Sequence, residues 1–120
     1  MNKNSISTNE EILLGEFLKS LNGQYRAVFQ IDSNLVIYGN KGALWHSNTA
    51  QTTGVRLVLR DDGNLVMVTH KNNIIVWNTG TNDKEVSQRM RLTLTDAGYL
   101  EITRDGEKIW TSEKSEGTKP

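Results

Sequence analysis

The chain has 120 residues, which is enough for one domain with a modest hydrophobic core but not for two. The 14 Lys and Arg balance the 14 Asp and Glu, so no net charge would draw the protein to nucleic acid or to an anionic membrane. Cysteine is absent, which excludes disulfide bonds, thiol catalysis and metal sites built from thiolates.

The N-terminal part of the chain gives few structural signals. Its first ten residues are polar and lack the apolar core of a signal peptide, so we expect a cytoplasmic protein, export by another route, or a signal already removed. No apolar run is long enough for membrane insertion. The apolar residues within 9–21 have some helical spacing, but Gly15 and Gly23 make a helix less favourable. We therefore predict that residues 9–21 form the leading strands of the first unit.

Residues 30–38 alternate polar and apolar side chains, which is the period of a β-strand. One face of this strand would carry Ile31, Leu35 and Ile37 and could join a core. The opposite face would carry two amides, a carboxylate, a valine and a phenol: Gln30, Asp32, Asn34, Val36 and Tyr38. Such groups suit a ligand rich in hydroxyl groups better than a metal ion, a phosphate or a nucleophilic reaction.

The same unit occurs three times along the chain. The segments that align without gaps are residues 27–38, 57–68 and 92–103. Each copy then turns and reaches a tryptophan, and the three tryptophans are 32 and 33 residues apart: Trp45, Trp77 and Trp110. A period near thirty residues indicates one supersecondary unit used three times. We predict a single domain, 1–120, with units at about 22–50, 51–86 and 87–112 and a polar tail at 113–120.

Each unit is predicted to consist of strands, because Val, Ile, Thr, Tyr and Trp are enriched in the patterned runs. Turn signals separate the runs at Gly39–Gly42, at Lys71–Asn73 and at Asp105–Gly106. Asp-Gly favours a two-residue hairpin, since both residues tolerate positive φ. Three small sheets cannot each bury an apolar face alone, so we expect them to face one another around a common axis, with the tryptophans packed toward it.

This pattern resembles the monocot mannose-binding lectins, also called bulb-type or snowdrop-like lectins, whose signature Gln-x-Asp-x-Asn-x-Val-x-Tyr occurs three times per domain. Residues 30–38 match the signature at all five places, and the resemblance extends over about residues 7–112. The cysteine-free chain and its N-terminal sequence are similar to the soluble, non-plant or cytoplasmic members. The resemblance implies an all-β fold, the β-prism II, with three four-stranded antiparallel sheets around a pseudo-threefold axis.

The resemblance also implies a role for each residue of the first copy. Asp32 and Asn34 would bind the axial 2-hydroxyl of mannose, Gln30 the 3-hydroxyl and Tyr38 the 4-hydroxyl. Val36 would contact the C–H face of the sugar. The residue types fit these roles, because a carboxylate only accepts hydrogen bonds whereas an amide both donates and accepts. The alternative is a solvated polar strand face without a ligand.

The other two copies depart from the signature to different degrees. The second copy keeps Asp62, Asn64 and Val66 but has Arg60 and Val68 at the Gln and Tyr positions, so it is either a weaker second site or a remnant kept for folding. Arg60 is placed to pair with Asp62. The third copy keeps none of the five residues, and we expect no mannose site there; it has Thr95, Ala97, Tyr99, Glu101 and Thr103.

Other combinations of residues give weaker signals. Residues 61–64 look like part of a calcium loop, but Asn72 stands where a bidentate Glu is needed. His46 and His70 lie in different units, without visible partners for a metal or a triad. The adjacent Asp61 and Asp62 would point to opposite faces of a strand, unlike the paired carboxylates of a glycosidase. We therefore expect no metal, no cofactor and no catalytic residue, and the scattered arginines do not indicate a nucleic-acid groove.

The leading functional hypothesis is a non-enzymatic lectin that binds D-mannose or mannose-containing glycans and glycoproteins, mainly through the first copy. Such a shallow site would depend on multivalent presentation, and we expect a homodimer. Family members often exchange C-terminal strands in their dimers, but the polar tail after Trp110 argues against that exchange here. The alternative is a protein-interaction or antimicrobial, bacteriocin-like module on the same fold. A glycan-cleaving enzyme lacks an acid–base pair in this sequence.

Overall fold

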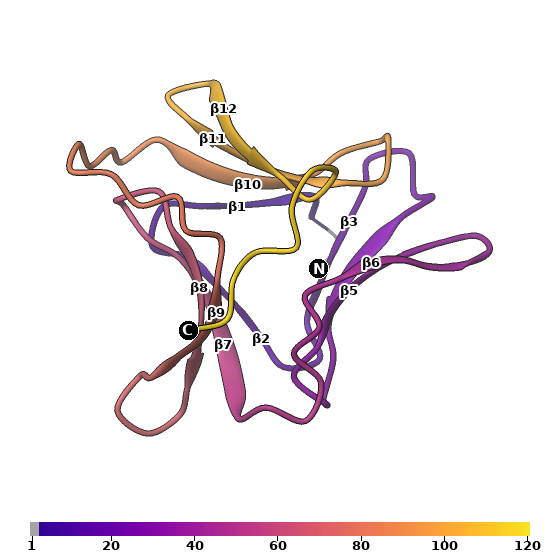
Figure 1. Cartoon of the computed structure of the whole chain (residues 1–120). Coiled ribbons are helices and arrows are strands. Elements are labelled where there is room, and N and C mark those ends of the chain that lie inside the picture. The colour runs from indigo at the N-terminus through magenta and orange to yellow at the C-terminus, as the bar shows by residue number, and fades with distance from the viewer. Residues whose placement is uncertain (1–2) are drawn as a thin grey trace.

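Three four-stranded antiparallel sheets make up the computed structural model, which describes residues 3–120. The sheets surround a common axis like the sides of a triangular prism (Figure 1). Within the described residues there are twelve strands and no helix. The predicted β-prism architecture is therefore confirmed.

Each sheet combines one strand from the N-terminal segment with three consecutive strands from one repeat unit. The first sheet contains β3 (Phe17–Lys19), β4 (Arg26–Phe29), β5 (Leu35–Gly39) and β6 (Gly42–His46). The second contains β2 (Glu11–Leu13), β7 (Gly54–Leu59), β8 (Leu65–Thr69) and β9 (Ile75–Asn78). The third contains β1 (Ser5–Ser7), β10 (Met90–Leu94), β11 (Leu100–Arg104) and β12 (Glu107–Thr111).

The N-terminal segment serves all three sheets, so the prediction that residues 9–21 lead the first unit is wrong for most of that segment. Only β3 pairs in the first sheet, with β4, whereas β2 pairs with β7 and β1 pairs with β10. Asn9 and Gly15 adopt positive φ at the two corners between these strands. The middle residue of each strand is buried in the common core, and these residues recur every six positions: Ile6, Ile12 and Leu18.

Equivalent positions of the three copies form the core around the axis. They are fully or almost fully buried: Phe29, Leu59 and Leu94; Leu35, Leu65 and Leu100; Ile37, Met67 and Ile102. These are the apolar positions that the repeat alignment brings into register. The core is therefore pseudo-symmetric, and each sheet contributes one inward face to it.

The three tryptophans pack edge to face near the axis, as predicted. The ring centroid of Trp45 lies 6.4 Å from that of Trp77 and 6.2 Å from that of Trp110. Trp77 is completely buried and Trp110 nearly so, whereas Trp45 is half-buried. Trp45 therefore contacts both other tryptophans and links the third strands of the three repeat units.

The C-terminal tail lies across this cluster, and Figure 1 shows the yellow end of the ribbon running from β12 across the middle of the prism. The indole N–H of Trp45 donates to the carbonyl of Ser115 at 2.9 Å, and that of Trp77 donates to the carbonyl of Glu116 at 2.7 Å. A Cβ at Gly117, whose φ is +75°, would come within 2.5 Å of the Trp77 ring. The tail thus closes one end of the prism and depends on a glycine to lie against Trp77.

The predicted turns are confirmed. Asp105 and Gly106, with φ of 50° and 86°, connect β11 to β12 as the Asp-Gly hairpin requires. Asn72 and Asn73 also have positive φ, between β8 and β9. Asn40 and Lys41 connect β5 to β6, where Gly39 pairs with Gly42.

Candidate functional site

The signature residues of the first copy lie on a hairpin, and the prediction of one continuous strand over 30–38 is wrong. β4 ends at Phe29 and β5 begins at Leu35. Between them, the N–H of Gln30 donates to the carbonyl of Asn34 at 2.9 Å, and Ser33 adopts a φ of 72°. Asp, Ser and Asn favour such a turn through local hydrogen bonds.

The turn changes which side chains reach the core. Ile31, expected on the inner face, is 75% exposed at the tip of the loop. Asn34, expected on the solvent face, is only 9% exposed. Val36 is buried although it lies on the outward side of β5, because it packs between Val28 of β4 and His46 of β6.

The hairpin brings the two ends of the signature together. The amide nitrogen of Gln30 donates to the hydroxyl of Tyr38, although the two residues are eight positions apart. Asp32 is exposed, and one of its carboxylate oxygens accepts the backbone N–H of Asn34 at 3.0 Å. Its remaining acceptor capacity faces solvent, so the carboxylate is available to a ligand hydroxyl.

Asn34 also fastens the hairpin to the chain that follows β6. Its Oδ1 accepts the hydroxyl of Ser47 at 3.2 Å and the backbone N–H of Thr49 at 3.1 Å. Its Nδ2 lies 3.2 Å from Nδ1 of His46. The hydroxyl of Thr49 donates in turn to the carbonyl of Ser33 at 2.6 Å. Asn34 is therefore a structural residue as well as a candidate ligand-binding one.

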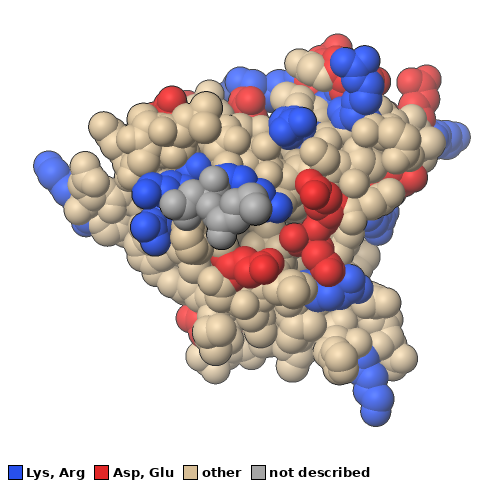
Figure 2. Space-filling view, turned by 180° about the vertical axis from the view of Figure 1, so that it is seen from behind, with Lys and Arg blue, Asp and Glu red and all other residues tan. Residues whose placement is uncertain are grey.

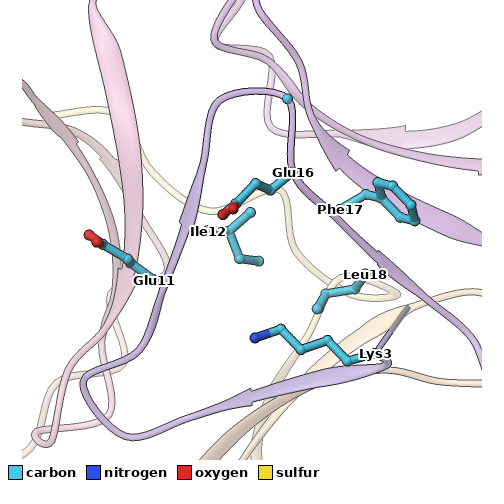
Figure 3. A pocket seen from close by; sticks show the side chains of 7 residues that line it. Lys3, Glu11, Ile12, Glu16, Phe17 and Leu18 are labelled. Carbon is cyan, nitrogen blue, oxygen red and sulfur yellow. The ribbon is translucent and has the colours of Figure 1, made fainter. Parts of the chain in front are cut away.

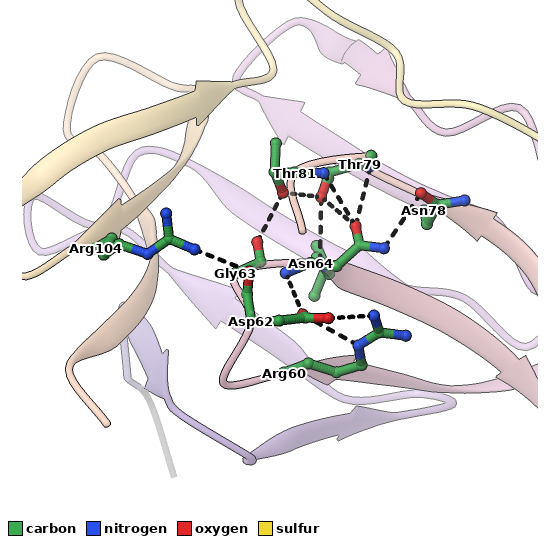
Figure 4. Close-up of polar contacts among 10 residues, drawn as sticks. Arg60, Asp62, Gly63, Asn64, Asn78, Thr79, Thr81 and Arg104 are labelled. Atoms are coloured by element: carbon green, nitrogen blue, oxygen red, sulfur yellow. Dashed lines mark hydrogen bonds and ion pairs between the residues drawn. The ribbon is translucent and has the colours of Figure 1, made fainter. Parts of the chain in front are cut away.

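The second copy repeats this network, as Figure 4 shows. Oδ1 of Asn64 accepts the hydroxyl of Thr79 at 3.1 Å and the N–H of Gly80 at 3.0 Å, and its Nδ2 donates to Oδ1 of Asn78 at 3.4 Å. The hydroxyl of Thr81 donates to the carbonyl of Gly63 at 2.7 Å. The residues after each tryptophan were not singled out from the sequence, although the aligned pairs Ser47/Thr79 and Thr49/Thr81 were a usable signal.

Asp62 is engaged by Arg60 in a two-pronged ion pair, as predicted. Nε of Arg60 lies 3.2 Å from Oδ1 of Asp62, and its Nη2 contacts Oδ2. Burial opposes the charge of Asp62, but hydrogen bonds from Arg60 and from the Asn64 N–H outweigh it and hold the pKa of this carboxyl below its usual range. A sugar would have to displace Arg60 to use both carboxylate oxygens.

The third copy presents a different surface. Nζ of Lys108 lies 3.4 Å from Oε1 of Glu101 and 5.7 Å from the ring centroid of Tyr99. Glu101 occupies the position that Val36 has in the first copy. This face has a charged pair where the first copy has an apolar contact.

Several hollows of the surface lie away from the signature hairpin. A hollow of about 370 Å³ between β2 and β3 has charged side chains around buried aliphatic ones (Figure 3). Its lining consists of Lys3, Glu11, Ile12, Gly15, Glu16, Phe17 and Leu18. None of these residues belongs to the signature. The hairpin itself offers a ligand the exposed carboxylate of Asp32 and the contacting pair Gln30 and Tyr38.

Three further features of the described residues bear on other classes of ligand. Within residues 3–120, no three His, Asp or Glu side chains come together as metal ligands. That same part of the chain contains no helix with the length and apolarity needed to cross a membrane. Acidic and basic side chains are interspersed over the face seen in Figure 2, and neither sign covers it.

Comparison with known proteins finds similar sequences and similar structures. No family model matches the chain. The chain is 39% identical over 116 residues to the B-type lectin plumieribetin of Scorpaena plumieri, covering 97% of this chain and 100% of that protein. It superposes on a monomeric monocot mannose-binding lectin from Gastrodia elata with a TM-score of 0.80 at 26% identity, over 94% and 99% of the two chains. It superposes on Polygonatum cyrtonema lectin complexed with monomannoside with a TM-score of 0.73 at 32% identity, over 93% and 97%.

Proposed function

Because the chain belongs to the family of B-type, or bulb-type, lectins, we propose that it is a non-enzymatic lectin for D-mannose and mannose-containing glycans and glycoproteins. The proposal depends chiefly on one observation: the first copy has the complete signature, and the hairpin brings Gln30 and Tyr38 into contact while the carboxylate of Asp32 stays exposed. Mannosides are the ligands bound in a similar structure, that of Polygonatum cyrtonema lectin.

In the proposed site, each side chain has a capacity that matches one part of the sugar. Asp32 accepts from a hydroxyl, and the N–H of Asn34 Nδ2 that does not face His46 is free to donate to the same hydroxyl. Gln30 and Tyr38 already contact each other, so they present neighbouring polar groups to the next two hydroxyls. Val36 supplies the apolar contact beneath them.

A titration of the protein with methyl α-D-mannoside, followed by calorimetry, tests this function. We expect saturable binding with about one site per chain, and much weaker binding of the galactoside, whose 2-hydroxyl is equatorial. A glycan array extends the test to mannose-containing glycans. If no mannose-bearing glycan bound, the lectin function would be lost. Capture of protein partners that excess mannose does not displace would then support the interaction-module alternative.

One complete site per chain makes assembly relevant to affinity. A homodimer would present two sites, and linked sites bind multivalent glycans more tightly than isolated ones. The tail lies on its own tryptophan cluster, with Thr118 paired to Asn78 of the same chain. We expect the proposed homodimer to leave this tail in place, because the tail after Trp110 is polar.

The second copy provides a test of the pairing between Arg60 and Asp62. The double variant Arg60→Gln/Val68→Tyr restores the signature and removes the cation that engages Asp62. We expect the stoichiometry of mannoside binding to rise from about one to about two per chain, as measured by calorimetry or native mass spectrometry. Val68→Tyr alone serves as the control, since it leaves the ion pair in place. An unchanged stoichiometry in the double variant would show that the pair is not what limits this copy.

A further inference from the structure

His46 lies beside the proposed mannose site on the neighbouring strand. It is the last residue of β6 and stands directly opposite Val36 of β5, so the two side chains lie on the same outward face of the sheet. The ring is exposed, and a sugar placed over Val36 would lie next to it. The inference drawn from this position rests on the proposed mannose function.

The contacts of Asn34 determine which nitrogen of a neutral His46 ring carries the proton. A backbone N–H only donates, so the bond from the Thr49 N–H identifies the side-chain atom of Asn34 on that side as Oδ1. Nδ2 of Asn34 must then face His46, and an amide nitrogen only donates. Nδ1 of His46 is therefore the acceptor, and the neutral ring carries its proton on Nε2.

The equivalent residues of the other copies support a link between this position and the signature asparagine. In the second copy Asn78 stands opposite Val66, and its side chain accepts from Asn64 at 3.4 Å. In the third copy Tyr99 replaces the asparagine, and the hydroxyl of Thr111 at the matching position is buried without a hydrogen-bond partner among the described residues. Only the first copy has a histidine at this position.

We propose that His46 is a positioning residue of the mannose site, which makes sugar binding depend on pH. The neutral ring accepts from Asn34 through Nδ1 and presents its Nε2–H on the sugar-binding face. A protonated ring carries N–H at both nitrogens, so Nδ1–H would face the N–H of Asn34 with no acceptor between them. The ring must then leave this orientation, and the site loses both its hold on Asn34 and the Nε2 donor.

The ionisable groups on the elements packed against His46 come from the hairpin loop, from β5 and from the tail: Asp32, Tyr38, Glu113, Lys114, Glu116 and Lys119. Asp32 lies in the hairpin loop, and Tyr38 lies two positions beyond Val36 on β5. From the tail, Nζ of Lys119 donates to the carbonyl of Asn48 at 2.9 Å, two residues after His46. Within residues 3–120, none of these groups forms an ion pair with the His46 ring. The hydrogen bond with Asn34 is thus the contact that protonation breaks.

Calorimetry with methyl α-D-mannoside at about pH 8 and at about pH 5 tests the proposal, since imidazole titrates between these values. We expect the affinity of the wild type for the mannoside to be roughly two- to tenfold lower at the lower pH, which corresponds to the loss of about one hydrogen bond. His46→Asn, which supplies the side chain that the second copy uses, should bind equally at both pH values. His70→Asn removes the other histidine, which lies in the β8–β9 turn, and should keep the wild-type pH dependence.

A second measurement does not depend on sugar binding. In the sugar-free protein, the side-chain amide signals of Asn34 in ¹H–¹⁵N spectra should shift with pH in step with the His46 ring, and should stay fixed in His46→Asn. The proposal is overturned if these signals do not respond in the wild type, or if His46→Asn binds mannoside with the wild-type pH dependence. Absence of mannoside binding at both pH values would instead overturn the proposed function itself.

Discussion

Replacing Trp77 by alanine is expected to lower the free energy of unfolding by about 3–5 kcal/mol, the usual range for removing a buried tryptophan. Trp77 is 0% exposed, and its ring contacts Trp45 edge to face. The indole N–H of Trp77 also donates a hydrogen bond to the carbonyl of Glu116, and Gly117 lies directly against the Trp77 ring. The substitution would therefore leave a cavity at the axis and release the tail that covers it.

Urea unfolding followed by circular dichroism measures this effect without relying on tryptophan fluorescence. Leu44→Ala is the matched control: Leu44 is also an apolar residue of a third strand, but it is 57% exposed and its loss should change stability by no more than about 0.5 kcal/mol. If the two variants were equally stable, the tryptophan cluster would not be the point at which the three sheets are held together.

The repeat pattern was sufficient to predict the three-sheet architecture, because each copy has the same apolar positions and the same tryptophan. It was not sufficient for the N-terminal strands. Those strands are three residues long and carry a single buried side chain each, so neither alternation nor propensity identifies them. Their partners lie up to about ninety residues away in the chain, as in the pairing of Ser5 with Thr93. The six-residue recurrence of Ile6, Ile12 and Leu18 is the one local signal that reveals them.

The candidate site was predicted as a set of residues but not as a conformation. Strict alternation cannot distinguish a long strand from two strands joined by a five-residue turn, and only the positive φ of Ser33 and the bond between Gln30 and Asn34 decide this. The inward role of Asn34 was missed for a related reason. It depends on the chain after β6, which the hairpin brings close only once the sheet has formed.

The hydrogen bonds of the signature asparagine distinguish the first and second copies from the third, which lacks this residue. In the first and second copies, the signature asparagine connects the hairpin to a hydroxyl-bearing residue two positions after the tryptophan. The third copy retains that residue as Ser112, whose hydroxyl still accepts the N–H of Leu100 at 2.9 Å, but it has lost the asparagine. Asn64 has a structural role in its hydrogen bonds, so its presence is not by itself evidence for mannose binding, and a mannose function for the second copy needs the separate evidence of stoichiometry.

Replacing Asp32 by asparagine is expected to weaken mannoside binding by at least about tenfold, since a hydrogen bond to a charged group contributes roughly 1.5–3 kcal/mol. Asparagine keeps the size of the side chain and an oxygen that can accept the Asn34 N–H, so the hairpin should retain its shape. Asp32→Ala removes that oxygen as well and should bind no better. If Asp32→Asn, which keeps the shape of the hairpin, loses binding as Asp32→Ala does, the loss is due to the missing charged acceptor and not to a disordered loop.

Calorimetry with methyl α-D-mannoside at neutral pH measures the loss, and circular dichroism verifies that the variant is folded. Asp61→Asn is the control for loss of a negative charge near a signature loop, because the Asp61 side chain makes no hydrogen bond within residues 3–120 and is not part of the signature. It should bind as the wild type does. If Asp32→Asn bound mannoside with unchanged affinity, the sugar would have to lie away from the loop, and the assignment of Gln30, Asn34 and Tyr38 would fail with it.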